Sequence, residues 1–247
     1  MAIPRRTLIL SVALPLLVVS GSCVLLNLPT TTRQGLDYRV TTHSIPLYVK
    51  AIDFIQRHYQ YELLVSNICR EGATDVECVS AIFEWTHKNI SPTPPGWPVV
   101  DSHPLTIIIR GHGKSDQIAD VFTTLSTYAG VRAFFSHIRD SASGADIVLS
   151  FARVDGDWVP FDVERHVTFR DSKGRLASIE TLVNDPAMVE GATEGVLPDD
   201  LSYSTFISPA RLMPFVAPRW SHADLQRPWS RAQYELRRLI GRESESN

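Results

Sequence analysis

The chain has 247 residues, and its 24 Lys and Arg against 27 Asp and Glu give a formal net charge of -3. A protein that neutralises nucleic-acid phosphates needs a clustered excess of positive charge, so we expect no nucleic-acid partner. Hydrophobic residues make up 44% and charged residues 21%, which is the usage of a globular protein and excludes a chain that is disordered throughout. We therefore expect one folded domain behind a short N-terminal segment.

Residues 1–28 have the pattern of a membrane segment. No charged residue occurs from Thr7 to Leu28, and Arg5 and Arg6 stand directly before this run. Roughly 20 apolar residues are needed to cross a hydrocarbon core of about 30 Å, and the flanking arginines favour the cytoplasm. This predicts an N-terminal transmembrane helix with the rest of the chain extracytoplasmic, in the periplasm or at the cell surface. The alternatives are a cleaved signal peptide and a lipoprotein signal that ends before Cys23; both place the rest on the same side.

The segment after the predicted anchor is a tether, and the next cysteines are a candidate disulfide. Residues 29–43 are polar and Thr-rich, as in a linker. Cys69 and Cys78 are nine residues apart, and in an oxidising compartment they can pair. Two buried free thiols are the alternative. A metal site needs three or four ligands, and no other Cys or His stands close to this pair in sequence, so we predict no metal site there.

Three helices are predicted in the first half of the domain. Residues 44–61 form the first. The second begins at Thr74, because T-D-V-E places Glu77 in capping-box order, and it ends before the Pro-rich run S-P-T-P-P-G-W-P. Residues 101–109 are expected to be irregular. The third begins at Ser115, a good N-cap, and ends at Gly130, which can adopt the left-handed conformation.

After Gly130 the hydrophobic period changes to that of strands, over 131–138, 147–154 and 158–162, with a tight turn at Asp155-Gly156. Helices followed by an antiparallel meander predict an α+β domain, with helices packed on a sheet. Residues 181–247 are expected to be a C-terminal extension that ends in an amphipathic helix, 229–240. Its arginines are either a solvated face or a surface that docks on acidic lipid.

Three segments of this domain resemble the transglutaminase-like superfamily. They are A-I-F-E-W-T-H-K-N-I at 81–90, G-H-G-K-S-D-Q-I-A-D-V-F at 111–122 and D-G-D-W-V-P-F-D at 155–162. The resemblance implies a papain-like fold over residues 44–180. It also implies a site with Cys at a helix start, His on the following strand and Asp on the next.

The chain departs from this pattern at two of the three positions. Ser115 stands in the place of the Cys, and Asp146 or Ile147 in the place of the His, whereas Asp162 is kept. A helix dipole worth at most about 2 kcal/mol cannot ionise a hydroxyl, so Ser115 needs a positioned base. A carboxylate with a pKa of about 4 is a poor base for an alcohol, which applies to Asp146. We expect a catalytically inactive domain that binds a peptide or glycan of the cell envelope or surface, without a cofactor.

Other arrangements stay open at this point. His137, at the end of the first strand, could supply a base and rebuild a Ser115–His137–Asp162 constellation, which would make the chain a serine acyl-transferase or hydrolase. His112 is a second candidate base. A metal site that includes His103 and His166 is a further alternative, as is a structural accessory subunit of a membrane complex. The remaining alternatives are purely structural roles: Ser115 only caps its helix, and Asp162 only binds backbone amides.

Overall fold

The computed structural model describes residues 20–36, 39–98, 101–140, 143–191, 197 and 201–241. The chain divides into two compact units, Met1–Arg57 and His58–Asn247. Most of the predicted anchor lies outside the described residues, which begin with a helical stretch at 20–26. Within the described part of the chain, no helix combines the length and the apolar composition that a membrane span requires.

The first unit contains a β-hairpin. Strands β1 (Pro29–Leu36) and β2 (Arg39–Pro46) pair antiparallel, with Pro29 opposite Pro46 and Leu36 opposite Arg39. We expected a tether here, but Thr is β-branched and favours extended backbone, so a Thr-rich segment can pair with its neighbour. Helix α2 (Leu47–Ile68) follows directly. It begins three residues later than predicted, because residues 44–46 belong to β2, and it continues seven residues beyond the predicted end.

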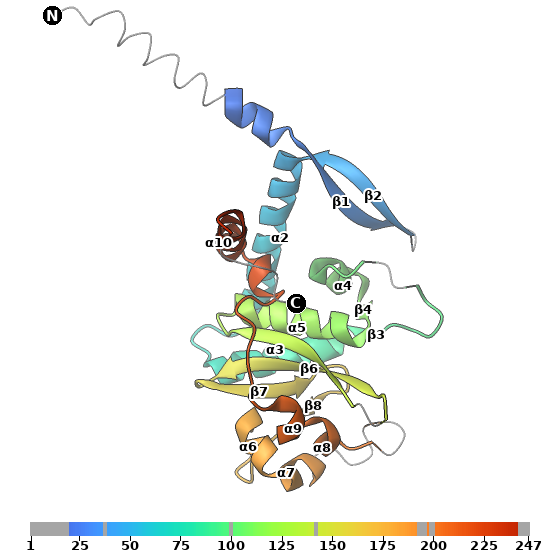
Figure 1. The fold of residues 1–247 in the computed structure, drawn as a ribbon, viewed down its shortest axis with the longest axis vertical. Coiled ribbons are helices and arrows are strands. Elements are labelled where there is room, and N and C mark those ends of the chain that lie inside the picture. The colour runs from blue at the N-terminus through green and yellow to red at the C-terminus, as the bar shows by residue number, and fades with distance from the viewer. Residues whose placement is uncertain are drawn as a thin grey trace, which may run out of the picture. The chain divides into compact units, whose positions relative to one another are not determined.

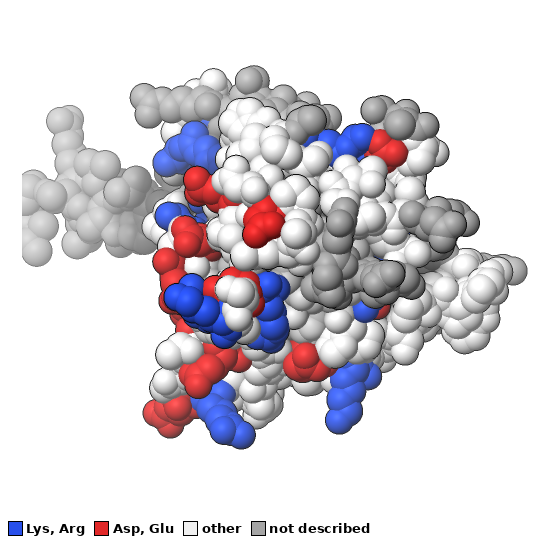
Figure 2. Space-filling view, turned by 90° about the horizontal axis from the view of Figure 1, so that it is seen from below, with Lys and Arg blue, Asp and Glu red and all other residues white. Residues whose placement is uncertain are grey.

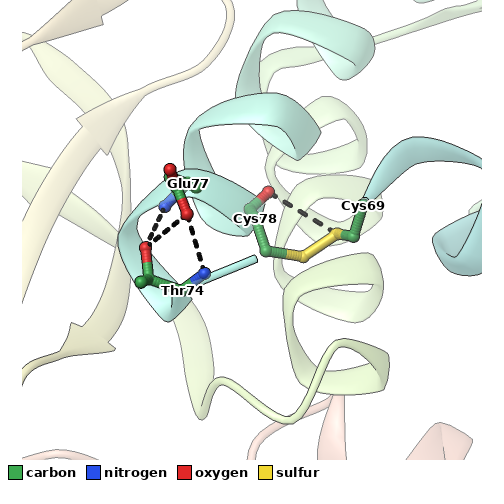
Figure 3. The surroundings of a disulfide bond; sticks show 4 residues. All are labelled: Cys69, Thr74, Glu77 and Cys78. Carbon is green, nitrogen blue, oxygen red and sulfur yellow. Dashed lines mark hydrogen bonds between the residues drawn. A yellow bond between two sulfur atoms is a disulfide. The ribbon is translucent and has the colours of Figure 1, made fainter. Parts of the chain in front are cut away.

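The second unit contains the predicted capping box and disulfide. Helix α3 (Asp75–Asn89) has Thr74 as its N-cap: the Thr74 hydroxyl accepts from the Glu77 N–H at 3.3 Å, and the Glu77 carboxylate accepts from the Thr74 N–H at 2.9 Å. One turn away, Cys69 and Cys78 form a disulfide, which confirms the predicted pairing (Figure 3). The bond ties the end of α2 to the start of α3.

The sheet of the second unit is the predicted antiparallel meander with one short strand added. Its order is β5 (Ala133–Arg139), β6 (Asp146–Val154), β7 (Asp157–Asp162) and β8 (Val167–Thr168). The β6–β7 turn has positive φ at both Asp155 (52°) and Gly156 (95°), as the Asp-Gly pair predicted. Alternate residues of these strands enter different cores, since successive side chains point to opposite faces.

Helices cover both faces of this sheet, and because all its strands pair antiparallel the fold is α+β. Helices α3, α4 (Pro104–Arg110) and α5 (Ser115–Tyr128) lie on one side, and α6 (Ile179–Asn184), α7 (Pro186–Gly191), α8 (Tyr203–Phe206) and α9 (Pro209–Leu212) lie on the other (Figure 1). The core on the α5 side contains Phe83, Phe122 and Phe161. The core on the other side contains Phe151 and Tyr203. The C-terminal extension therefore supplies one of the two layers.

Helix α4 replaces the irregular stretch that we expected. The side chain of His103 accepts from the Leu105 N–H at 3.3 Å and so acts as the N-cap, Pro104 occupies the first turn, and Gly111 ends the helix with φ of 71°. Pro in the first turn and Gly at the C-terminal end are common at helix boundaries, whereas His103 is an unusual N-cap. Beyond α4, the short strand β4 (His112–Gly113) pairs in parallel with β3 (Ser91–Pro92).

The C-terminal segment returns across the edge of the sheet. Strand β5 is an edge strand, and the Arg211 guanidinium donates to the backbone carbonyl of Arg139 at its end. Near the other end, Arg132 donates to the carbonyl of Pro218. The 3-10 helix η1 (Asp224–Gln226) and helix α10 (Pro228–Leu239) follow, close to the predicted terminal helix. On the face that carries α6–α9, acidic and basic side chains lie beside one another, and the described residues form no extended region of one sign there (Figure 2).

Candidate functional site

The start of α5 is positioned by two glycines. Gly111 needs its positive φ to end α4, and a Cβ on Gly113 would lie 3.1 Å from Gln117 Cβ and 3.2 Å from Ile107 Cγ2. The helix then begins at Ser115, with Lys114 as the N-cap, so our prediction that Ser115 is the N-cap was wrong by one residue. The Gln117 side-chain oxygen accepts from the Lys114 N–H at 3.1 Å. Because Ser115 lies one residue inside the helix, its hydroxyl is not the cap of this helix and can bind another partner.

The partner of Ser115 is a carboxylate. Its Oγ donates to Glu164 Oε2 at 2.7 Å, and Glu164 stands two residues after the end of β7. The neighbouring residue, Arg165, places its guanidinium 3.5 Å from the same carboxylate oxygen. Sequence reasoning did not single out Glu164, because it lies two residues beyond the last segment that carries the resemblance, 155–162. Ser115 is thus connected to the β7 end by a hydrogen bond that does not involve an imidazole.

Asp162 lies at the other end of the same chain of contacts. Its side chain is fully buried and accepts from the Arg165 backbone N–H at 3.0 Å, from the Arg165 guanidinium at 2.9 Å and from the Tyr203 hydroxyl at 2.6 Å. Tyr203 comes from α8, in the C-terminal extension. We call Ser115, Glu164, Arg165, Asp162 and Tyr203 the Ser115–Tyr203 network. It brings together two of the predicted site residues through three that were not predicted.

The charged groups of this network stabilise one another. Burial lowers the pKa of Arg165, but the charge of Asp162 and its hydrogen bond outweigh burial, so the pKa of Arg165 is raised. Burial and the adjacent Asp162 carboxylate also raise the pKa of Tyr203 far above its usual range. Tyr203 is therefore a permanent hydrogen-bond donor to Asp162. Both oxygens of Asp162 are occupied by Arg165 and Tyr203, which makes this carboxylate a structural anchor for the β7 end.

His137 pairs with Asp146 and points away from Asp162. Its Nδ1 lies 2.9 Å from Asp146 Oδ2. In the sheet register His137 is opposite Val148, and Phe161 is opposite Ser150, so His137 and Phe161 share a face. Asp162 follows Phe161 and points to the opposite face. The structure therefore brings together His137 and Asp146, and it separates His137 from Asp162 by the sheet.

The other candidate histidines each have a local role. His103 caps α4. His112 lies 3.3 Å from Thr93 Oγ1 and packs edge-on against Trp97, and burial together with the charge of Arg110 lowers its pKa. His166 has a positive φ of 58°, and its Nε2 contacts the Glu84 carboxylate at 2.9 Å. Within the described residues no group of three or more His, Cys, Asp or Glu side chains is arranged to hold a metal ion.

A cleft of about 390 Å³ opens beside the first turns of α5. It begins one residue after Ser115 and continues to a segment from the C-terminal extension. Its lining residues are Asp101, Ser102, His103, Asp116, Gln117, Asp120, Phe135 and His222. We call it the α5 cleft. The lining combines carboxylates, imidazoles and an amide around one aromatic ring, which suits a polar ligand with an apolar portion.

A carboxylate–imidazole pair forms part of the wall of the α5 cleft. Asp120 is buried on α5, and its Oδ1 lies 2.8 Å from His222 Nδ1. Burial raises the pKa of Asp120, and the hydrogen bond to Asp120 raises the pKa of His222 against an opposing effect of burial. The amide nitrogen of Gln226 lies 3.4 Å from the other imidazole nitrogen. The two residues of the pair are 102 positions apart, so no sequence motif could have joined them.

Comparison with known proteins gives only distant similarity. No protein-family model matches the chain, and no curated protein matches it. Solved chains do match, and two of them carry the names "Putative Cysteine Protease", from Cytophaga hutchinsonii, and "Putative Protease", from Parabacteroides distasonis. The first is 17% identical with a TM-score of 0.38 and covers 48% of this chain; the second is 13% identical with a TM-score of 0.35 and covers 54%. The matches span only 40% and 35% of those two chains.

Proposed function

We propose that this chain is a membrane-anchored, extracytoplasmic protein whose transglutaminase-like domain binds a peptide or glycan of the cell envelope or surface in the α5 cleft, without acyl transfer at Ser115. The observation that carries the proposal is the hydrogen bond from Ser115 Oγ to Glu164 at 2.7 Å. An acyl-transfer nucleophile needs a base that takes its proton, and here the group in that position is a carboxylate.

The strength of the base decides between binding and catalysis. The reference pKa of a carboxylic acid lies about two units below that of an imidazole, so a carboxylate is a much weaker acceptor for a hydroxyl proton. The Arg165 guanidinium at 3.5 Å is attracted to the Glu164 carboxylate and offsets its negative charge. His137 faces the other side of the sheet from Asp162 and is engaged by Asp146. These contacts support an inactive site.

The α5 cleft supports binding as the remaining role. It adjoins Ser115, so it occupies the neighbourhood of the nucleophile position that the family resemblance implies. Its lining includes the Phe135 ring, on which a sugar or an aliphatic side chain can pack, and polar side chains that can pair with amides and hydroxyls. The Cys69–Cys78 disulfide supports the extracytoplasmic location, because disulfides persist in oxidising compartments.

The absence of serine chemistry is tested with a fluorophosphonate probe, which labels activated serine hydroxyls. We expect the wild-type protein to be labelled no more than Ser115→Ala, with a known serine hydrolase as the positive control. Labelling that requires Ser115 would contradict the proposal in favour of a serine acyl-transferase or hydrolase. In that case the variants Glu164→Gln and His137→Ala would identify the base, because only the variant that lacks it would lose the label.

Binding in the α5 cleft is tested by calorimetric titration with three soluble probes: a peptidoglycan glycopeptide, its free stem peptide and its unsubstituted glycan. We expect at least one probe to bind, and Phe135→Ala to weaken binding by about tenfold, or about 1.4 kcal/mol, through loss of the ring surface. The matched control is Ser136→Ala, the next residue on the same strand, whose side chain points to the opposite face of the sheet and does not line the cleft, so it should leave binding unchanged. Equal weakening by both variants, or no binding of any probe, would count against the cleft.

A further inference from the structure

Helix α10 is attached to its domain by its polar side. Tyr234 packs edge-on against Trp220 with 6.4 Å between ring centroids, and it is only partly exposed, as are Ser230 and Gln233. At about 100° per residue, Ser230, Gln233 and Tyr234 lie within about one third of the helix circumference. The side of α10 that carries Tyr234 and its contact with Trp220 is therefore polar.

The apolar side of α10 faces solvent. Trp229, Leu236, Leu239 and Ile240 are 74%, 58%, 84% and 61% exposed. With the same angular step they form a continuous stripe about 100° wide, centred nearly opposite Tyr234. A surface helix of a globular protein normally turns such a stripe inward. Within the described residues this stripe has no core to pack against.

The charges on α10 are mostly positive. Its sequence carries Arg231, Arg237 and Arg238 against Glu235, a local net charge of 3 minus 1, or +2. Arg231 and Arg238 both pair with Glu235, at 2.7 and 3.6 Å. With the same angular step, Arg237 lies between Gln233 and Ser230, on the polar side of the helix. An apolar stripe on one side and arginines on the other is the pattern of a helix that lies in the interface of an anionic bilayer.

A second copy of the chain is a less suitable occupant than lipid. A helix of 12 residues is about 18 Å long, and one face of it is far smaller than the roughly 800 Å² per partner of a stable protein interface. The same chain carries the charge-free run Thr7–Leu28, which is long enough to hold the domain at a membrane. We propose that α10 lies in the surface of an anionic lipid bilayer, with Trp229, Leu236, Leu239 and Ile240 among the upper acyl chains. This second membrane contact is independent of any ligand in the α5 cleft.

The experiment compares two sides of the helix in the full-length chain. A single cysteine is introduced as Leu239→Cys or Arg238→Cys in a Cys23→Ser background, and each variant is labelled with the environment-sensitive dye NBD under non-reducing conditions. The proteins are reconstituted in nanodiscs of phosphatidylcholine alone or of an equal mixture with phosphatidylglycerol. Both substituted side chains are exposed, so circular dichroism should show unchanged folding in each.

We expect a blue shift and quenching by acyl-chain spin-labelled lipid for the Leu239→Cys label in the phosphatidylglycerol mixture, and neither effect for the Arg238→Cys label. High salt should reduce the Leu239→Cys effect, because the Debye length falls to about 3 Å at 1 M. The proposal is overturned if both labels behave alike, or if lipid charge has no influence. It is also overturned if the Leu239→Cys label is shielded in detergent together with a doubled sedimentation mass, which would identify a second copy as the occupant.

Discussion

Replacing Asp162 by alanine is expected to lower the free energy of unfolding by about 3–5 kcal/mol. The side chain is fully buried, and its removal leaves the Arg165 guanidinium without the carboxylate that compensates its charge and the buried Tyr203 hydroxyl without its acceptor. Urea denaturation followed by circular dichroism measures the loss.

The matched control for this prediction is Asp157→Ala, at the exposed start of the same strand, where a surface substitution changes stability by about 0.5 kcal/mol or less. If Asp162→Ala and Asp157→Ala were equally mild, the Ser115–Tyr203 network would not anchor the end of β7. The hydrogen bond between Ser115 and Glu164 would then lack this support.

The second large effect is expected from Phe122→Ala. Phe122 is fully buried on α5, with 6.2 Å between its ring centroid and that of Phe83 on α3, and 5.1 Å to that of Phe161 on β7. Truncation removes a ring that contacts both the neighbouring helix and the sheet and leaves a cavity, so we expect a loss of about 3–5 kcal/mol. Thermal unfolding and urea unfolding both measure this loss of stability.

Phe122→Leu is the control for the second prediction, because it keeps most of the apolar volume and should lose clearly less stability. Phe161 precedes Asp162, so the cavity also lies beside the residue that ends β7. An Ala variant no less stable than the Leu variant would show that the core between α5 and the sheet can close over the missing ring.

Much of the fold could be predicted from local chemistry. The capping box at Thr74 and Glu77 needs only residues three apart, and the Asp155-Gly156 turn needs only two adjacent residues that tolerate positive φ. The disulfide was predictable because a short loop keeps Cys69 and Cys78 close together. Helix α4 was missed since it has seven residues and begins at a histidine cap, which leaves little periodic signal.

The site was less predictable because its contacts are long-range. Glu164 is 49 residues from Ser115, and Tyr203 is 41 residues from Asp162, so only the packed sheet brings them together. The strand order correctly placed His137 beside the start of the next strand, where it pairs with Asp146. Strand order alone does not determine to which face of the sheet the His137 side chain points. The pleat sends alternate residues to opposite faces, and the register of β5, β6 and β7 decides which face His137 occupies.

The segment that crosses β5 bears on how this protein behaves at high concentration. A free edge strand offers unpaired amides and carbonyls to any neighbouring chain, which is a common start of aggregation. Here the guanidinium of Arg211 occupies the carbonyl at Arg139, and Arg132 holds the returning backbone at Pro218. By holding the returning segment beside β5, these two contacts leave less of the edge open to strand pairing with a second copy of the chain.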